Sequence, residues 1–479
     1  MALIKKLLSS NNFLSLANNG LVAVFAFLSF IMLVRQLDQE VFGEWILFLT
    51  AGGFIDMLRF GITRTAIIRF LAGAQPEEGK SLIGSNNAIN LITTLLISLV
   101  LYLLYVVFSA SINDSGFAMF FKWYPLLALF NLPFNNAQSI LQAQLRFDRM
   151  LVLRILNVGS FMLFLALNLF MSWSIDIIIY AYLLTNLLSS VVSSIFNWDG
   201  IRYTFKASRK TNSLILDFGK YTTGTLIGSN LLKSSDTFII GLSPFMGTVG
   251  VAVYSIPLKL TEIIEIPLRS FAGTAFPGMS KAAIENDFEK ARQIFYENAG
   301  GLTLLMIPVM IFCIIFAEQI VYILGGSDYI ISANIFRIFC IYGMLLPLDR
   351  FIGVGLDSVN KPKQNFLKVM YMASSNIIGN IIAVFGLSVV IMGFSWVLLI
   401  ASGIAADDAY RISHGFTLIK VLEIVAMVTI GFTIVGILIG YYFLNKELQL
   451  SKKAIFVEGF RALERIAKSF TNRNNTKGS

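Results

Sequence analysis

The feature of this sequence that most limits its possible folds is a series of long apolar segments repeated along the chain. A helix needs roughly 20 consecutive, mostly apolar residues to cross the hydrocarbon core of a bilayer. Within lipid, helices of this kind satisfy every backbone hydrogen bond internally. The sequence therefore predicts an all-α polytopic membrane protein with about 12 transmembrane helices. The segments are 14–34, 42–58, 86–109, 117–141, 151–172, 175–196, 214–242, 249–276, 298–323, 330–356, 366–390 and 416–444.

Composition agrees with a membrane protein and excludes several kinds of site. Hydrophobic residues make up 56% of the 479 residues and charged residues only 14%, whereas soluble proteins contain about 25% charged residues. The two cysteines, Cys313 and Cys340, both lie in apolar segments, so no disulfide framework is indicated. His414 is the single histidine, and no Ser/His/Asp set or His cluster can be assembled around it. We expect no catalytic site, no metal site and no enzyme activity.

The positions of the basic residues predict the orientation of the chain. Cytoplasmic loops of membrane proteins collect Lys and Arg. With the N-terminus inside, only Arg35, Lys122 and Arg411 fall on the outer side, and the remaining loop cations fall on the inner side. This asymmetry predicts that both termini are cytoplasmic. It also assigns the net charge of +9 to membrane orientation rather than to nucleic-acid binding.

The longest polar connection in mid-chain divides the sequence into two halves. It occupies 197–212 and predicts an N-terminal six-helix lobe at 1–196, a basic cytoplasmic linker at 197–212, and a C-terminal six-helix lobe at 213–445. A weak internal repeat supports the division, because LDQEVFG (37–43) follows the first segment and LSPFMGTVG (242–250) follows the seventh.

Two further segments lie outside this plan. The basic tail, 446–479, contains an amphipathic helix with Phe456 and Phe460 on its apolar face. We expect that face on the anionic inner leaflet, with docking to a partner as the alternative. The stretch 391–414 holds a short apolar run. As a thirteenth span it would place the basic tail outside, so we expect an outer, interfacial or re-entrant segment.

Charged residues inside the predicted spans are the candidate functional residues. A Lys, Arg or Asp at the centre of a membrane helix costs roughly 2.5–3.5 kcal/mol, so such residues face a bundle interior or a water-filled cavity. In the eighth span all four charges share one side of the helix, three or four residues apart, beside Pro267. The charges considered are Asp56 and Arg59; Lys220, Lys233 and Asp236; Lys259, Glu262, Glu265 and Arg269; Arg337, Asp349 and Arg350; and Lys420 and Glu423.

Two interpretations of these charges remain open. They can form internal ion pairs that hold helices together without a ligand, as Asp349 beside Arg350 illustrates. Alternatively, an anionic ligand occupies the positive charge of Lys233, Lys259 and Arg269. The amide-rich stretch 131–149 of the fourth helix suits sugar hydroxyls, but hydrogen bonds between helices explain its amides equally well.

Four motifs in this order resemble one family. VRQLDQEVFGEW (34–45) is followed by GGFIDMLRFGITRTAIIRF (52–70), and later by LGGSDYIISANIFRIF (324–339) and VGLDSVNKPKQNFL (354–367). Together they resemble the bacterial polysaccharide exporters, the Wzx-like lipid-linked oligosaccharide flippases. Those proteins belong to the multidrug/oligosaccharidyl-lipid/polysaccharide (MOP) superfamily.

The resemblance implies two six-helix lobes around a cavity that opens alternately to the two membrane faces, as in MATE transporters. It implies an undecaprenyl-diphosphate-linked oligosaccharide as substrate, such as an O-antigen, capsule or exopolysaccharide repeat unit. It also implies a bacterial inner-membrane location, coupling to H⁺ or Na⁺, and a polysaccharide polymerase and other assembly proteins as partners. For the substrate diphosphate we expect Lys233, Lys259, Arg269, Arg59, Arg64 and Arg350; for ion coupling or charge pairing, Asp236, Glu262, Glu265 and Asp349.

Three rival functions are weighed against this one. A drug or cation antiporter of the same superfamily would favour an acidic cavity. In this chain, basic side chains are prominent among the charges of the predicted spans. A membrane-embedded glycan polymerase or ligase would need an accessible outer site, and the sequence has only 391–414 to offer one. A peptidoglycan-precursor flippase would have two additional C-terminal spans.

Overall fold

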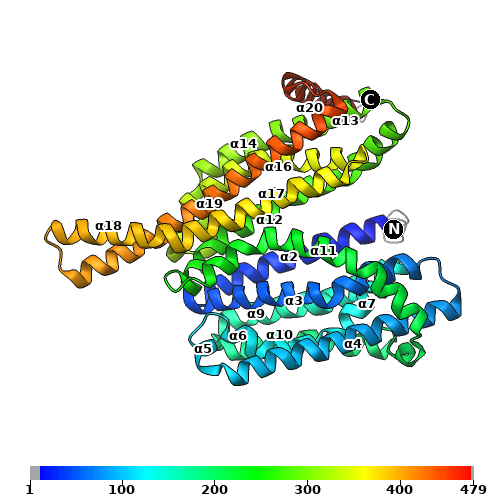
Figure 1. Ribbon diagram of the computed structural model, residues 1–479, viewed down its shortest axis with the longest axis horizontal. Helices are drawn as coiled ribbons and strands as arrows, with labels where there is room; N and C mark the ends of the chain where they lie inside the picture. The colour runs from blue at the N-terminus through cyan, green and yellow to red at the C-terminus, as the bar shows by residue number, and fades with distance from the viewer. Residues whose placement is uncertain (1–10, 476–479) are drawn as a thin grey trace. The chain divides into compact units, whose positions relative to one another are not determined.

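The computed structural model describes residues 11–475, and within them the chain is helical with short connections and no strand (Figure 1). The helices form two compact units. Unit 1 comprises residues up to Asn230 together with Gly247–Ala252, and unit 2 comprises Leu231–Met246 and the chain from Val253 onward. The division falls inside a long helix, α11 (Arg209–Gly241), and not in the 197–212 connection where the sequence placed a linker.

The elements of unit 1 follow one another closely along the chain. They are α2 (Asn11–Gln36), α3 (Gln39–Leu71), α4 (Pro76–Val107), α5 (Ser109–Asn113), α6 (Ala118–Phe130), α7 (Leu132–Ala143), α8 (Phe147–Arg154), the π-helical turn η1 (Ile155–Gly159), α9 (Ser160–Met171), α10 (Ile175–Ile195), the 3₁₀ helix η2 (Ile201–Lys206) and the first part of α11.

Unit 2 begins in α11 and contains the remaining helices. These are α12 (Gly247–Ile284), whose first turns belong to unit 1, α13 (Phe288–Phe295), the π-helical turn η3 (Tyr296–Gly300), α14 (Gly301–Ile315), α15 (Ala317–Gly325), the 3₁₀ helix η4 (Ser327–Ser332), α16 (Ala333–Ser358), α17 (Pro362–Ile381), the π-helical turn η5 (Ile382–Leu387), α18 (Ser388–Ala401), α19 (Ala406–Leu448) and α20 (Lys452–Asn475).

The predicted membrane fold is confirmed. Eight helices within the described residues are long and apolar enough to cross a membrane, and Gly20–Gln36 and Ala118–Phe130 are shorter apolar helices. Every one of the predicted apolar segments falls within a helix or within consecutive helices.

The 197–212 connection is a folded part of unit 1. Asp199 is buried, and its carbonyl accepts a hydrogen bond from Asn87 Nδ2 at 2.9 Å. The 3₁₀ helix η2 lies against α4 at Gly84, where an added Cβ would stand 2.2 Å from the Tyr203 carbonyl oxygen. Glycine therefore permits this close approach, and the connection packs onto α4.

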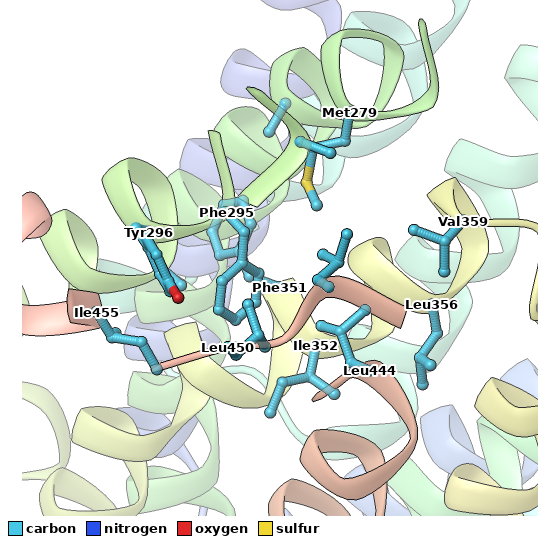
Figure 2. Packing of buried hydrophobic residues seen from close by; sticks show 14 of the residues in the cluster. Met279, Phe295, Tyr296, Phe351, Ile352, Leu356, Val359, Leu444, Leu450 and Ile455 are labelled. Atoms are coloured by element: carbon cyan, nitrogen blue, oxygen red, sulfur yellow. The ribbon is translucent and has the colours of Figure 1, made fainter. Parts of the chain in front are cut away.

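The core of unit 2 joins α20 to the transmembrane helices (Figure 2). Phe295, Phe351, Leu356, Leu444 and Ile455 are all almost fully buried in one cluster, contributed by α13, α16, α19 and α20. The cluster fixes the end of α19 and the start of α20 against the bundle.

Helix α20 has two different faces. Ile455, Gly459 and Ala462 are buried, while Phe456 and Phe460 are exposed. The buried face rests on η3 and α14, where a Cβ on Gly459 would lie 2.4 Å from the Gly300 carbonyl carbon. Arg465 also pairs with Glu297 at 2.7 Å. The tail is thus docked on unit 2, and the apolar face predicted to meet the inner leaflet remains uncovered.

The stretch 391–414, for which the sequence predicts an outer, interfacial or re-entrant segment, is helical on both sides of a short turn. It forms the end of α18 and the start of α19, which pair as a helical hairpin that projects past the other helices of unit 2 (Figure 1). Trp396 Nε1 donates to the Ala406 carbonyl at 3.4 Å across its tip, and the hydroxyls of Ser395 and Ser413 bond to each other. The prediction treated a short apolar run as a separate element, whereas the helices continue through it.

Candidate functional site

A stripe of charged side chains on α12, joined by one residue of α11, is the candidate site of unit 2. Lys259 pairs with Glu262 at 2.7 Å, one helical turn along α12. Glu265 pairs with Arg269 at 3.0 Å on the same helix and lies 3.6 Å from Lys233 of α11. The structure therefore gathers the predicted cations of α11 and α12 around two carboxylates.

This stripe is accessible and carries excess positive charge. The side chains of Lys233, Arg269 and Glu262 are 62%, 53% and 56% exposed. Three cations share two carboxylates, which leaves one positive charge when all groups are ionised. Pro257 and Pro267 lie within the same helix, and each removes one backbone hydrogen bond. The stripe can hold a ligand by charge-assisted hydrogen bonds.

Asp236 occupies a buried polar network in unit 2, not an ion pair with a described cation. Its carboxylate accepts hydrogen bonds from Tyr254 at 2.9 Å and from Asn380 at 2.7 Å. Asn380 also donates to Asn376 Oδ1 at 2.6 Å, and Asn376 donates to Ser235 at 3.0 Å. Asn380 Oδ1 has no partner among the described residues. The network thus presents a carboxylate and a free amide oxygen close together.

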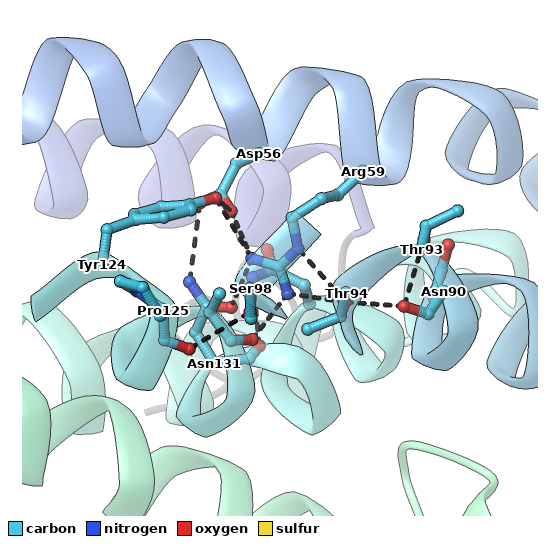
Figure 3. A network of polar contacts seen from close by, with 11 residues as sticks. Asp56, Arg59, Asn90, Thr93, Thr94, Ser98, Tyr124, Pro125 and Asn131 are labelled. Atoms are coloured by element: carbon cyan, nitrogen blue, oxygen red, sulfur yellow. Dashed lines mark hydrogen bonds and ion pairs between the residues drawn. The ribbon is translucent and has the colours of Figure 1, made fainter. Parts of the chain in front are cut away.

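Arg59 lies in the interior of unit 1 (Figure 3). Its side chain is fully buried, and its Nη1 donates to Asp56 at 2.6 Å. The other nitrogens donate to Thr94 and to the Ala128 carbonyl, at 2.6 to 3.1 Å. These contacts join α3 to α4 and α6, so in this structure Arg59 is a packing residue and is not open to the ligand expected for it.

The tenth predicted span contains a different ion pair from the one expected. Asp349 pairs with Lys368 of α17 at 2.6 Å, and the Lys368 side chain is only 4% exposed. From the sequence, only the neighbouring Arg350 was considered as the partner of Asp349. Arg350 is exposed on α16, and Arg64 is exposed on α3, one turn beyond Arg59.

Sequence reasoning missed Tyr254, Asn376, Asn380 and Lys368. The two asparagines lie four residues apart in a stretch, 369–406, that has no charged residue. A pair of amides at helical spacing in so apolar a segment was a usable signal, because an amide in lipid needs a partner. No comparable signal marked Tyr254 or Lys368, whose partners lie on other helices.

Comparisons with known proteins place the chain among membrane proteins of glycan assembly. A sequence profile of the family described as "Polysaccharide biosynthesis protein" matches residues 32–334. The probable low-salt glycan biosynthesis flippase Agl15 of Haloferax volcanii is 24% identical over 370 residues, which cover 76% of this chain and 75% of that protein.

Solved structures with the same fold include two transporters. An inward-facing multidrug resistance MATE family transporter of the MOP superfamily superposes with a TM-score of 0.67 at 17% identity, covering 90% of this chain and 96% of that one. The lipid II flippase MurJ, in an inward closed conformation, gives a TM-score of 0.67 at 13% identity, covering 96% and 92%. At these identities the likeness concerns the fold, and it confirms the predicted MATE-like architecture.

Proposed function

Because the chain belongs to the polysaccharide biosynthesis protein family, whose profile matches residues 32–334, we propose that it is a flippase for a lipid-linked oligosaccharide. The substrate proposed is an undecaprenyl-diphosphate-linked repeat unit of a surface polysaccharide. The protein would carry it across the bacterial inner membrane by alternating access. The flippase named among its relatives supports this function.

The charged stripe on α12 is the observation that carries the proposal. A diphosphate at membrane depth needs cations as partners, and the stripe offers Lys233, Lys259 and Arg269 on an accessible face. Glu262 and Glu265 hold these cations without a ligand, so an arriving diphosphate competes with two carboxylates. This competition allows release as well as binding, which transport requires.

The balance of charge in the stripe favours an anionic substrate over a cationic drug. Two carboxylates among three cations leave no excess negative charge to attract a cation. We therefore prefer the flippase to the antiporter. We also propose a transporter rather than an enzyme, since the named relatives and fold neighbours are flippases and transporters.

We further propose that the Asp236 network is the coupling-ion site. A carboxylate with two neighbouring amides supplies the oxygen ligands that Na⁺ requires, and the same carboxylate can take up H⁺. Asn380 Oδ1, which has no partner among the described residues, supports an additional ligand there. Membrane lipids surround the protein, and a polysaccharide polymerase and other assembly proteins are its proposed partners.

The test measures translocation in proteoliposomes that contain the purified protein and a fluorescent undecaprenyl-diphosphate oligosaccharide. Substrate that has crossed to the far leaflet is protected from an impermeant quencher. We expect Lys233→Gln and Lys259→Gln each to slow translocation by a factor of about 10 to 100, because each removes a charge-assisted hydrogen bond worth about 1.5–3 kcal/mol.

Lys281→Gln is the matched control on α12. Lys281 is 74% exposed and lies 3.8 Å from Glu285, outside the stripe, so its loss should leave translocation unchanged. Normal rates in both stripe variants would overturn the role of the stripe. If the wild-type protein fails to move the lipid but takes up a fluorescent organic cation, the proposed flippase function is wrong and the antiporter function is supported.

A further inference from the structure

The 197–212 connection of unit 1 exposes both apolar and basic side chains. Phe205 of the 3₁₀ helix η2 is 99% exposed, and Ile201, at the start of the same helix, is 52% exposed. The chain from 200 to 216 also contains four basic residues and no carboxylate. All four basic side chains are exposed. We call these six residues the η2 surface: Ile201, Arg202, Phe205, Lys206, Arg209 and Lys210.

The opposite side of the connection is fixed to α4. The hydroxyls of Ser85 and Thr211 are hydrogen-bonded at 2.6 Å, and both residues are buried. An added Cβ on Gly84 would stand 2.2 Å from the Tyr203 carbonyl oxygen, so the two backbones are in direct contact. The connection cannot turn over without breaking these contacts. Phe205 is therefore held in its exposed position by a folded support.

The contact with α4 places the η2 surface at the level of the lipid head groups. Gly84 lies eight residues after the start of α4 at Pro76 and two residues before the predicted apolar segment 86–109. The helix thus enters the hydrocarbon core close to this contact. Head groups and their boundary add about 10–15 Å in total to the roughly 30 Å of the core. An exposed phenylalanine at this level can contact acyl chains, and basic side chains can contact phosphates.

Contacts within unit 1 do not account for the basic residues of this surface. Among the described residues, the only carboxylate paired with one of the four is Glu77, which lies 3.6 Å from Lys206 and is 75% exposed. Glu77 also pairs with Lys80 at 2.6 Å. Arg209 and Lys210 open α11, whose first turn has no acidic residue, and positive charge at a helix N-terminus opposes the helix dipole. These cations therefore suit an external anionic surface better than they suit the helix.

We propose that the η2 surface anchors unit 1 on anionic phospholipids of the inner leaflet. Phe205 and Ile201 enter the boundary between head groups and acyl chains, and the four basic side chains contact lipid phosphates. Clusters of four or more Lys and Arg beside a transmembrane helix attract anionic lipids, and each residue strengthens the attraction about fivefold. The proposal does not depend on the flippase function. It makes the connection a membrane anchor, whereas the sequence predicted a linker.

The experiment measures which lipid lies beside Phe205 in the full chain. Cys313 and Cys340 are replaced by alanine, and Phe205→Cys carries a fluorophore that reports a change from water to lipid. Nanodiscs of phosphatidylcholine and phosphatidylglycerol contain one of the two lipids with a doxyl quencher near the top of its acyl chain. We expect quenching by both lipids, with an association constant at least about fivefold larger for phosphatidylglycerol.

A second variant tests the basic residues. Replacing all four basic residues of the η2 surface by glutamine should bring the preference for phosphatidylglycerol close to one. High salt should weaken the preference of the parent protein, because it screens charges outside the protein. The matched control has the same net charge but keeps the η2 surface, so it should keep the preference. It replaces four exposed lysines of unit 2 by glutamine: Lys281, Lys290, Lys363 and Lys453.

Two other label positions on α4 calibrate the quenching. Glu78 is exposed in the first turn of α4, before the contact with the connection, so a label on Glu78→Cys should stay in water and be quenched by neither lipid. Leu103 is 50% exposed within the apolar segment, so a label on Leu103→Cys should be quenched equally by both lipids. Thermal unfolding of every variant shows whether the fold is intact.

Three results would overturn the anchor. If neither lipid quenches the label at position 205, the η2 surface stands in water and is open to a protein partner instead. If both lipids quench it equally, the surface does not select anionic lipids. If the unit 2 variant loses the preference as well, net charge and not the η2 surface attracts the lipid. None of these measurements uses translocation, so failure of the flippase function would leave the anchor untouched, and the reverse also holds.

Discussion

Arg59 is a fully buried cation whose charge partner, Asp56, lies one helical turn away. Removing one member of a buried ion pair leaves the other charge uncompensated, at a typical cost of 3–5 kcal/mol. Asp56 is 31% exposed, so we expect Arg59→Met to lower the free energy of unfolding by about 3 kcal/mol, at the lower end of that range. Thermal unfolding in detergent measures the effect.

Two further variants test whether the loss of stability comes from breaking the buried ion pair of Arg59. Arg64→Met, five residues along on the exposed surface of α3, should change stability by no more than about 0.5 kcal/mol. Asp56→Asn combined with Arg59→Met should recover part of the loss, because no unpaired charge remains. If Arg59→Met is as stable as Arg64→Met but fails to bind undecaprenyl diphosphate, Arg59 contacts the ligand after all.

Asp236 allows a separate test of ion coupling. Asp236→Asn preserves the size of the side chain and an oxygen acceptor, but it removes the charge that would hold Na⁺ or H⁺. We expect translocation by this variant to become independent of imposed Na⁺ and pH gradients, while the wild type responds to one of them. The proteoliposome assay provides the measurement.

Asp217→Asn is the control for Asp236→Asn. Asp217 lies on the same helix, is exposed, and pairs with Lys220 at 3.1 Å, so its loss should leave the gradient response intact. A wild-type protein that responds to neither gradient would remove the coupling role from Asp236.

Residue spacing explains which contacts could be predicted from the sequence. The pairs Lys259–Glu262 and Glu265–Arg269 lie within one helix, where a separation of three or four residues brings side chains together. The pair Lys368–Asp349 and the bonds from Asn380 and Tyr254 to Asp236 join different helices. Their formation depends on how helices pack, and a single sequence does not contain that information in its spacing.

At the scale of elements, the contact between α20 and η3 is unusually close. A Cβ on Gly459 would meet the Gly300 backbone at 2.4 Å, and backbone atoms cannot move aside as a flexible side chain can. We expect Gly459→Ala to destabilise the docked helix by about 1–3 kcal/mol, a typical cost of overpacking. Faster tryptic cleavage at Lys452 and Lys453, the first two residues of α20, would report the change.

Gly431→Ala in α19 is the corresponding control. An added Cβ there meets nothing within 4 Å, and alanine is the better helix former by about 1 kcal/mol, so stability should be unchanged or higher. Equal cleavage rates for Gly459→Ala and Gly431→Ala would show that the glycine contact does not hold α20 in place.

The lengths of elements were harder to predict than their existence. Apolar periodicity and length located the membrane helices, because each must satisfy its own backbone within lipid. The same criterion says little about where a helix ends once it leaves the bilayer. The prediction for 391–414 assumed that the eleventh span stops near residue 390, but no proline or charge interrupts the chain until Asp407, and α18 continues to Ala401.

At the scale of the whole molecule, the division into units reflects packing and not loop composition. The polar 197–212 connection was predicted to be a basic cytoplasmic linker between two lobes, yet Asp199 and Gly84 fix it against α4. The boundary lies instead within α11, at Asn230 and Leu231. A loop's polarity shows that it meets water, but only its contacts show whether it separates two bodies.

The orientation of the chain gives the last prediction, which combines helix length with loop charge. The continuous helix from Pro362 to Ala401 contains 40 residues and is about 60 Å long, twice the roughly 30 Å of the hydrocarbon core. Ser402, at the tip of the hairpin, should therefore stand outside the cell, whereas Asn286, between α12 and α13, should face the cytoplasm. With Cys313 and Cys340 replaced by alanine, we expect Ser402→Cys to react with an impermeant maleimide in intact cells. Asn286→Cys should react only after the membrane is permeabilised. The reverse pattern would invert the topology, and protection of Ser402→Cys under both conditions would place the hairpin within the membrane.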